Sequence, residues 1–343
     1  MNGREDGQMP KNFFFSRDIG IDLGTATVLV YVQGKGIVMR EPSVVAIDKT
    51  TDKVIKVGQE AQEMMGRTPD GIVAIRPLKD GIINQYEVTE RMLQYFIRRA
   101  CGSTLLPPRI MITVPSGISE VEERAILEAA REAGARKTFL IRAPIAAALG
   151  AGLNINTAIG NMTVDIGGGV TEIAVISLGG IVTSKTIKVG GDSFDEAIVR
   201  YIRDSYNVII GERTAEGIKM KIGEVYEHKE EKSVEVKGRD IDTGMPRSVK
   251  ISSKEMIGAT YEPMTALIDG ICDIIEQTPP ELVGDILHNG IVLVGGGSLL
   301  GGLDKLIERV TGIKTVRAKD PETCVALGTG EKLKTISRYS FEN

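Results

Sequence analysis

Short apolar runs separated by glycine turns recur along this chain, which is the pattern of strands joined by tight turns. Residues 164–166 and 173–176 are two such runs, and three glycines lie between them. The stretch 21–38 has the same order of strand, Asp-x-Gly turn, strand, glycine turn and strand as the stretch 164–182. Because the two stretches begin about 143 residues apart, the repeat predicts two related domains and not a short solenoid.

The two Asp-x-Gly turns predict a site for a phosphate chain and a divalent cation. Glycines leave backbone amides accessible, and convergent amides bind phosphate. Asp22 and Asp165 precede the turns, where a carboxylate can hold a divalent cation directly or through water. A Gly-Gly-Gly hairpin can also be only a turn, so the repetition of the pattern carries this prediction. Two such hairpins facing each other would hold one nucleotide between them.

Other segments have the apolar period of amphipathic helices. Ser119 and Glu122 form the pattern of a capping box, and the helix that follows has a predicted inner face of Val121, Ala125, Ile126 and Ala129. Residues 144–152 are mostly alanine and glycine, which predicts a closely packed helix suited to a hinge between domains. Residues 253–277 predict one long amphipathic helix, and residues 232–252 alternate with the period of a β-hairpin.

A third glycine signature follows the apolar run at 291–294. Its residues are Gly295, Gly296, Gly297 and Ser298. This strand and glycine turn superficially resemble a dinucleotide-binding turn, but the acid expected about 20 residues further on, at the end of a second strand, is missing. A backbone surface for an adenosine base and ribose is the better interpretation.

These patterns predict an α/β protein of two lobes, each with a small inserted subdomain. An N-terminal tail covers residues 1–17. We expect the core of lobe I in residues 18–39, 72–152 and 320–343, with its insert in 40–71. We expect the core of lobe II in residues 153–191 and 253–319, with its insert in 192–252.

Composition is that of an ordinary globular protein. The 343 residues are 42% apolar and 26% charged, with a net charge of −4. This balance excludes the basic excess typical of proteins that read nucleic-acid sequence, so no nucleic-acid partner is expected. The three cysteines have no metal or redox spacing.

Two apolar segments are candidates for contact with a membrane. No apolar run is as long as a membrane-spanning helix and no signal peptide is present. Phe13, Phe14 and Phe15 could form a membrane-surface anchor or begin the first core strand. Leu105 and Leu106 lie in a proline-bounded loop, where they could be the edge of a core or an exposed tip that dips into a membrane or contacts a partner.

The order of the two Asp-x-Gly hairpins, the small-residue connector and the Gly-Gly-Gly turn resembles the superfamily of actin, sugar kinases and heat-shock chaperone ATPases. Within it the chain is similar to the MreB family of bacterial actins from about residue 18 to the C-terminus. Further motifs that carry this resemblance are residues 114–118, 122–125, 134–136, 211–216 and 278–282.

The resemblance implies an actin-like fold of two ribonuclease-H-like lobes around a nucleotide cleft. It implies ATP and Mg²⁺ as cofactors and polymerisation into homopolymeric filaments. It also implies a cytoplasmic protein on the inner face of the cytoplasmic membrane that organises cell-wall synthesis and sets rod shape. Implied partners are the cell-wall elongation machinery and membrane morphogenesis proteins.

The family's functional residues fall on identifiable positions of this sequence. By resemblance, Gly24, Thr25, Ala26 and Thr27 of the first turn and Gly167, Gly168 and Gly169 of the second hold the phosphates, beside the metal-side Asp22 and Asp165. Glu216 and Lys219 hold the nucleoside, although on sequence alone they are a surface ion pair at i, i+3. Residues 295–298 form the adenosine turn, and residues 13–15 and 105–106 match the family's membrane-contact segments.

Departures from the family pattern fall where ATP hydrolysis is catalysed. Arg142 occupies the place of the glutamate that resembles the family's water-orienting residue, and a guanidinium has no acceptor site. Val170 replaces a threonine beside the γ-phosphate, and Thr27 replaces an asparagine. We therefore expect ATP binding and polymerisation with slow or absent hydrolysis. The alternatives are that Arg142 points away from the water or that the family tolerates the change.

Two other classes of protein share the same ATP cradle. A small-molecule kinase would need a general-base carboxylate near Arg142, and none is obvious in the sequence. A chaperone-type ATPase would need a substrate-binding domain after the ATPase, which we do not expect beyond Asn343.

Overall fold

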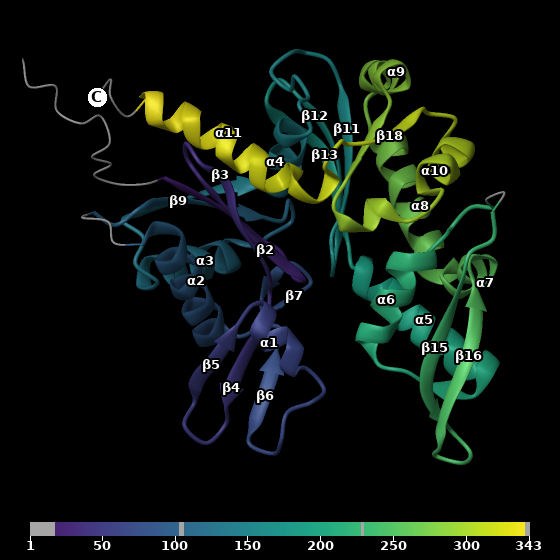
Figure 1. The fold of residues 1–343 in the computed structure, drawn as a ribbon. Helices are drawn as coiled ribbons and strands as arrows, with labels where there is room; N and C mark the ends of the chain where they lie inside the picture. The colour runs from purple at the N-terminus through teal and green to yellow at the C-terminus, as the bar shows by residue number, and fades with distance from the viewer. Residues whose placement is uncertain (1–17, 103–105, 228–229, 340–343) are drawn as a thin grey trace, which may run out of the picture.

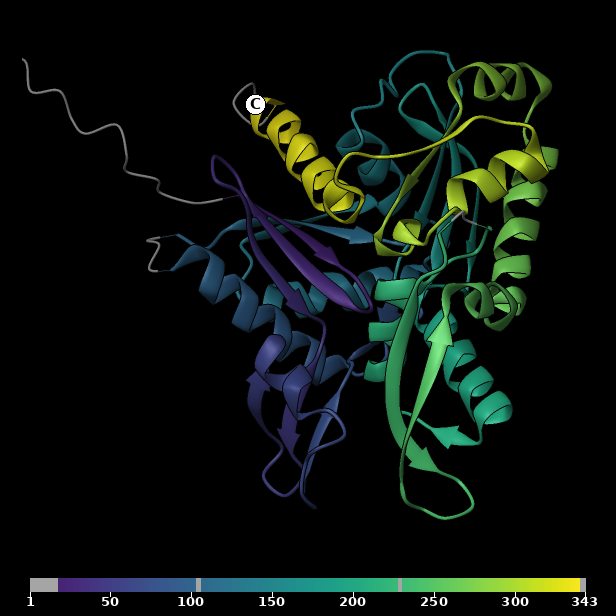
Figure 2. The same cartoon turned by 45° about the vertical axis from the view of Figure 1, so that its right-hand side comes forward.

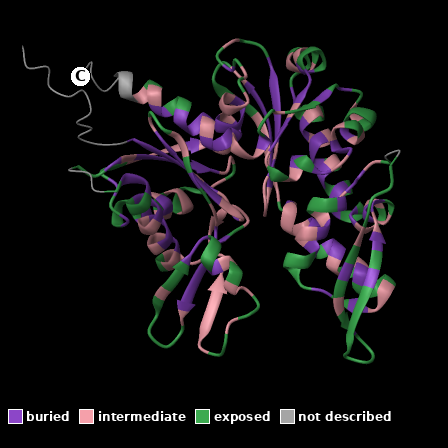
Figure 3. Ribbon diagram, in the orientation of Figure 1, coloured by how far each residue is buried: buried purple, intermediate pink, exposed green. Residues whose placement is uncertain are grey.

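The computed structural model describes residues 18–102, 106–227 and 230–339, and its two lobes are each built on a five-stranded sheet. Lobe I lies on the left of Figure 1 and lobe II on the right. The strands of both sheets are largely buried, whereas the exposed residues gather on loops, helix surfaces and the two inserts (Figure 3). The mixed α/β content agrees with the predicted class.

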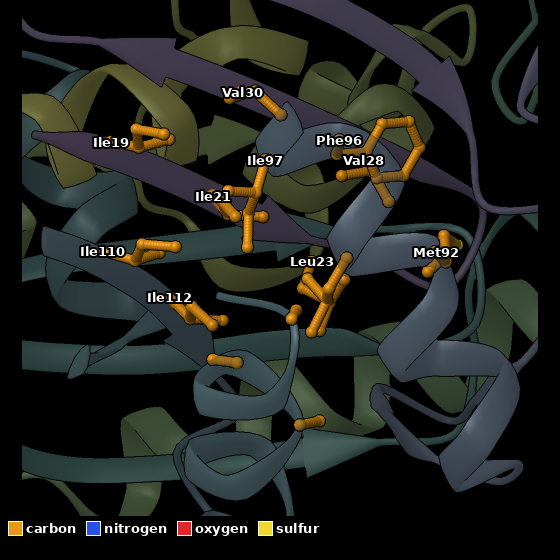
Figure 4. Packing of buried hydrophobic residues seen from close by; sticks show 14 of the residues in the cluster. Ile19, Ile21, Leu23, Val28, Val30, Met92, Phe96, Ile97, Ile110 and Ile112 are labelled. Carbon is orange, nitrogen blue, oxygen red and sulfur yellow. The ribbon is translucent and has the colours of Figure 1, made fainter. Parts of the chain in front are cut away.

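The sheet of lobe I has the strand order β10-β9-β1-β2-β3. Strands β1, β2 and β3 form an antiparallel meander, β9 pairs with β1 in parallel, and β10 pairs with β9 in parallel. The helix α2 buries Met92, Phe96 and Ile97 against the sheet, beside Ile21 and Ile112 (Figure 4). The elements are β1 (Ile19–Leu23), β2 (Thr27–Val32), β3 (Gly36–Pro42), α2 (Tyr86–Cys101), β9 (Arg109–Val114), α3 (Glu120–Glu132) and β10 (Lys137–Arg142).

The sheet of lobe II repeats this arrangement with the order β13-β12-β11-β17-β18. Here too an antiparallel meander is extended by two parallel strands, so the duplication predicted from sequence is present in the fold. The edge strand β18 was not predicted. The elements are β11 (Asn161–Ile166), β12 (Thr171–Ser177), β13 (Gly180–Ile187), α8 (Tyr261–Gln277), α9 (Pro280–Asn289), β17 (Ile291–Val294), η1 (Gly296–Leu299), α10 (Leu303–Thr311), β18 (Thr315–Arg317) and η2 (Pro321–Thr323).

Each lobe receives a helix from the other half of the chain. α4 (Ala143–Gly150) follows β10 of lobe I but buries Ala148 against Ala174 and Ile176 of β12 in lobe II. α11 (Cys324–Tyr339) follows lobe II but lies on β1 and β2 of lobe I, where Thr329 meets Gly20. The two helices also pack on each other (Figure 1). A Cβ on Gly328 would overlap the carbonyl oxygen of Ala146, so the helices cross in backbone contact.

The insert of lobe I contains a three-stranded sheet of order β5-β4-β6. Its third strand, β6 (Ile72–Ile75), pairs with β4 in antiparallel register, so the insert extends four residues past the expected boundary at Gly71. Gly71 directly precedes this last strand. The elements are β4 (Val45–Asp48), β5 (Lys53–Val57) and α1 (Gln59–Met64), and the hairpin of β7 (Leu78–Lys79) and β8 (Ile82–Ile83) follows.

Residues 253–277 form two helices, whereas their apolar period predicted one. Pro263 lies in the first turn of the second helix, and in a continuous helix its ring would clash with the carbonyl of Ala259. The first helix instead packs Met256 into the core of the insert. The elements are α5 (Gly191–Tyr206), β14 (Val208–Ile209), α6 (Glu212–Ile222), β15 (Ser233–Asp240), β16 (Pro246–Ser252) and α7 (Ser253–Ala259). Figures 1 and 2 show both inserts at the end of the molecule away from α4 and α11.

Candidate functional site

A cavity of about 500 Å³ lies between the lobes and is walled by the turns singled out in the sequence. Both lobes and the insert of lobe II contribute to its wall. The structure therefore brings together segments that are up to about 270 residues apart in the chain. The sequence-predicted residues that line it are Asp22, Gly24, Thr25, Ala26, Thr27, Asp165, Gly167, Gly168, Gly169, Val170, Glu216, Lys219, Gly295, Gly296 and Gly297.

The β1–β2 turn is held by backbone contacts from its own lobe. The amide of Gly81, in the β7–β8 hairpin, donates to the Thr25 hydroxyl at 3.0 Å. The carbonyl of Ala26 accepts from the amide of Ser43 at 2.9 Å. A Cβ on Gly24 would lie 2.6 Å from the Thr27 carbonyl oxygen, so this turn can close only around a residue without a side chain.

The β11–β12 turn is closed by a hydrogen bond from the Gly167 amide to the Val170 carbonyl at 3.0 Å. The carbonyls of Gly167 and Gly168 accept from the first two amides of α5, those of Gly191 and Asp192, at 2.9 and 2.8 Å. The turn is thus fastened to the N-terminus of a 16-residue helix, and such an end favours anions through its amides and its dipole.

Two carboxylates face the cavity from equivalent strands. Burial raises the pKa of Asp22 to about 6, against the effect of a hydrogen bond from the Thr113 hydroxyl at 3.0 Å. Burial and the nearby charges of Asp22 and Glu172 raise the pKa of Asp165 to about 8. Among the described residues none donates a hydrogen bond to Asp165. Two buried carboxylates fit a Mg²⁺ site, because protein-bound Mg²⁺ usually has only one or two carboxylate ligands and completes its coordination with phosphate oxygens and water.

A third carboxylate, Glu172, was not assigned a role from the sequence. It lies directly opposite Asp165 in the β11–β12 ladder, so the two side chains share one face of the sheet. Glu172 is only 3% exposed and lines the cavity. The signal that could have revealed it is an acid within the apolar strand Thr171–Ser177, because an isolated charge is seldom buried without a partner.

The side of the cavity formed by the insert of lobe II contains an ion pair that the sequence did not predict. Lys219 pairs with Asp195 at 2.8 Å, and both side chains are largely buried. Its ammonium also donates to the Gly191 carbonyl at 2.8 Å. Burial raises the pKa of Asp195 to about 6, although the charge of Lys219 opposes this. Glu216, the expected surface partner of Lys219, lines the same cavity.

The third glycine turn follows β17. Gly295 has φ of +79°, and a Cβ there would lie 2.5 Å from the Asp165 carboxylate. Ser298 is fully buried and donates to the Gly295 carbonyl at 2.7 Å. This hydrogen bond stabilises the turn. Among the described residues, Gly295, Gly296 and Gly297 line the cavity here and Ser298 does not. The turn continues as the short 3₁₀ helix η1.

Arg142 makes two contacts within its own lobe. Its guanidinium pairs with Glu123 of α3 at 2.6 Å and donates to the Pro115 carbonyl at 3.2 Å. It is not among the described residues that line the cavity, whereas Val170 lines it beside Gly81. Glu123 is the carboxylate near Arg142 that was not recognised in the sequence.

Comparison with known proteins now decides the family. The family model described as MreB/Mbl protein matches residues 16–340. The chain is a member of the MreB/Mbl family. It is 50% identical to the cell shape-determining protein MreB of Escherichia coli K12, with 95% of each chain covered. It is 49% identical to the cell shape-determining protein Mbl of Bacillus subtilis 168, covering 94% of this chain and 98% of Mbl.

Solved structures confirm the actin-like fold predicted for an MreB/Mbl protein. MreB5 of Spiroplasma citri bound to ADP superposes with a TM-score of 0.91 at 39% identity, covering 96% of this chain and 99% of that one. MamK from a double helical filament shares the fold, with a TM-score of 0.79 at 24% identity. The family is one of actin-like cell shape-determining proteins, which does not favour the small-molecule kinase alternative.

The candidate membrane segments are only partly placed. Phe13, Phe14, Phe15 and Leu105 lie outside the described residues. Leu106 is 42% exposed, at the end of the loop that precedes β9. In the described part of the chain, none of the helices has the length and apolar character that crossing a bilayer requires.

Proposed function

We propose that this MreB/Mbl protein binds ATP with Mg²⁺ in the cavity between its lobes. The observation that carries the proposal is the meeting of two glycine turns with Asp22 and Asp165 at one cavity. The relative MreB5 of Spiroplasma citri has been solved with ADP and with AMPPNP, which supports a nucleotide here. The turns would hold the phosphates, and the bound Mg²⁺ would neutralise phosphate charge next to the two aspartates.

The nucleoside would lie against the insert of lobe II. Glu216 and Lys219 of α6 line that side of the cavity, and the Asp195 ion pair holds the Lys219 ammonium in place. Gly295, Gly296 and Gly297 present backbone without side chains on the facing wall. A flat base and a ribose fit such a surface, because nothing projects from it.

We also propose that hydrolysis is slow or absent. The Arg142 guanidinium offers no acceptor to a water molecule, and its contacts are with Glu123 and the Pro115 carbonyl, so this position supplies no carboxylate to orient a water. Val170 adds an apolar side chain to the wall where the family resemblance places a hydroxyl. General-base assistance typically contributes about 10²- to 10⁴-fold, so the loss of an orienting carboxylate is sufficient to make turnover slow.

The cellular role we propose is a filament on the inner face of the cytoplasmic membrane that organises cell-wall synthesis. Support comes from the cell-shape role of the MreB and Mbl relatives and from the actin-like fold, which MamK adopts in a filament. Exposed Leu106 supplies a described apolar contact for lipid. Elongation-machinery and morphogenesis proteins would be the partners.

A single assay tests these proposals together. Purified protein is mixed with Mg·ATP and liposomes, filaments are pelleted, and released phosphate is followed in the same tube. We expect filaments on lipid with little phosphate. We expect Arg142→Glu to raise phosphate release by roughly tenfold or more, and Arg131→Glu, an exposed arginine in the last turn of α3, to leave it unchanged. Brisk release from the unaltered protein would refute slow hydrolysis, and absence of filaments would refute the polymer.

A further inference from the structure

The two lobes touch at a buried polar cluster beside the cavity, in addition to the crossing of α4 and α11. Its members are Glu172 of β12, Thr186 of β13 and Ser116 of the loop after β9. The first two belong to lobe II and Ser116 belongs to lobe I. The chain does not connect them locally, because Ser116 is 56 residues from Glu172. This contact therefore forms only when the lobes are together.

Glu172 has a full set of donors in this cluster. One carboxylate oxygen accepts from the Ser116 amide at 3.0 Å and from the Ser116 hydroxyl at 2.6 Å. The other accepts from the Thr186 hydroxyl. The two hydroxyl oxygens lie 3.3 Å apart. A carboxylate that is 3% exposed needs such donors, because a buried charge without hydrogen bonds is strongly unfavourable.

Two of these three donors come from the other lobe, so burial of Glu172 depends on lobe closure. If the lobes separate, the amide and hydroxyl of Ser116 leave, and water must replace them. Charge-assisted hydrogen bonds are about twice as strong as neutral ones, so breaking them opposes separation. Two ion pairs flank the same junction, Arg76 with Asp192 at 2.8 Å and Lys188 with Asp80 at 3.1 Å, but they are more exposed and therefore weaker.

We propose that Glu172, Ser116 and Thr186 form a clasp that holds the lobes together and slows release of a nucleotide from the cavity. Glu172 acts here as a positioning residue, because it fixes the lobe I loop and not a reacting atom. The cavity is walled by both lobes, so a nucleotide in it would contact both, and separation of the lobes would remove its contacts with one of them. The part of this inference that concerns nucleotide release rests on the proposed function; the clasp between the lobes does not.

Two side-chain changes separate the clasp from a general effect on folding. Glu172→Met keeps the length of the side chain but removes both acceptor oxygens. Glu172→Gln keeps one acceptor for Ser116 and gives a donor to the Thr186 hydroxyl, so it should restore the contact. Ser116→Ala removes one donor from the lobe I side. Thr265→Ala is the control, because its exposed hydroxyl donates to the Tyr261 carbonyl within α8, away from the clasp.

The experiment has two readouts. Amide hydrogen exchange of residues 115–118 is measured in the nucleotide-free protein, and dissociation of a fluorescent ATP analogue is measured with Mg²⁺ by competition with excess ATP. We expect Glu172→Met to accelerate both by roughly tenfold or more, since it removes charge-assisted hydrogen bonds. We expect Glu172→Gln to lie within about threefold of the unaltered protein, and Thr265→Ala to leave both rates unchanged.

The combined variant tests whether the two residues act together. Because Glu172 and Ser116 share one contact, the double variant Glu172→Met with Ser116→Ala should release the analogue no faster than Glu172→Met alone. Unchanged exchange of residues 115–118 in Glu172→Met, or effects that multiply in the double variant, would overturn the clasp. Failure of the unaltered protein to bind the analogue would instead overturn the proposed function, and the exchange measurement would still decide the clasp.

Discussion

The charge of Asp165 should make the nucleotide-free protein less stable as pH rises. Burial and the neighbouring carboxylates of Asp22 and Glu172 raise the pKa of Asp165 from 3.8 to about 8. Between about pH 4 and pH 8 the folded state therefore binds a proton that the unfolded state has released. The stabilisation from this proton is complete below about pH 4 and is lost as pH rises through 8. Asp165→Asn, which is neutral and of nearly the same shape, should remove this dependence.

The size of the effect follows from the pKa difference. Each unit of pKa is worth about 1.4 kcal/mol, so the full difference between 3.8 and about 8 would correspond to roughly 5 to 6 kcal/mol. Asp165 lines a cavity that water can enter, and this screening reduces the expected difference to about 2 to 3 kcal/mol. At pH 8, without metal or nucleotide, Asp165→Asn should be more stable than the unaltered protein by that amount.

Urea unfolding in EDTA from pH 5 to pH 8.5 measures this difference. A control is Glu308→Gln on α10, because Glu308 is exposed and distant from the cavity lining. Adding Mg·ATP should reverse the order at pH 8, since the cation would favour the ionised aspartate and the asparagine would bind it poorly. Parallel pH curves for Asp165→Asn and the unaltered protein in EDTA would refute the reasoning.

Four further substitutions test separate parts of the structure. Gly328→Ala should lower the free energy of unfolding by roughly 3 kcal/mol or more, because its Cβ would overlap the Ala146 carbonyl oxygen. Gly284→Ala should raise the free energy of unfolding by about 0.5 to 1 kcal/mol, because Gly284 lies on an exposed face of α9 with open space around it. Ser119→Ala should cost about 1 kcal/mol by loss of the capping box. Urea unfolding measures the free energy of unfolding of the two glycine variants and of the serine variant. Leu106→Asp should change stability by less than about 0.5 kcal/mol yet reduce liposome co-sedimentation, and unchanged sedimentation would exclude Leu106 as a lipid contact.

The sequence predicted the parts of the fold that depend on local pattern. The two hairpins, the capping box at Ser119 and the small-residue helix α4 are all present, because alternation, side-chain caps and small residues determine local structure directly. Local pattern also gave one wrong prediction. Val121 was assigned to the inner face of α3, but its side chain is 76% exposed. It lies in the first turn of the helix, before the helix reaches the sheet, so the apolar period there does not mark a buried face.

What the sequence could not predict depends on contacts between distant segments. Lys219 was expected to meet Glu216 one turn away, yet it pairs with Asp195 of another helix, since a partly buried ammonium requires a buried partner. Glu172 was not assigned a role from the sequence, because the groups that donate hydrogen bonds to its carboxylate come from another strand and from the other lobe. Helix boundaries such as the break before Pro263 were missed because the apolar period continues through both helices.

We expect different residues at the lobe junction to control release of the nucleotide and its hydrolysis. α4 and α11 cross in backbone contact at Gly328 and Ala146, so they cannot slide past one another, and opening must be a rotation about this crossing. The resistance to that rotation then lies in the contacts across the junction, among which Glu172 is the most buried. Arg142 is held within lobe I by Glu123 and takes no part in them. Substitution of Glu172 should therefore change release of nucleotide without restoring hydrolysis, whereas Arg142→Glu should restore hydrolysis without changing release.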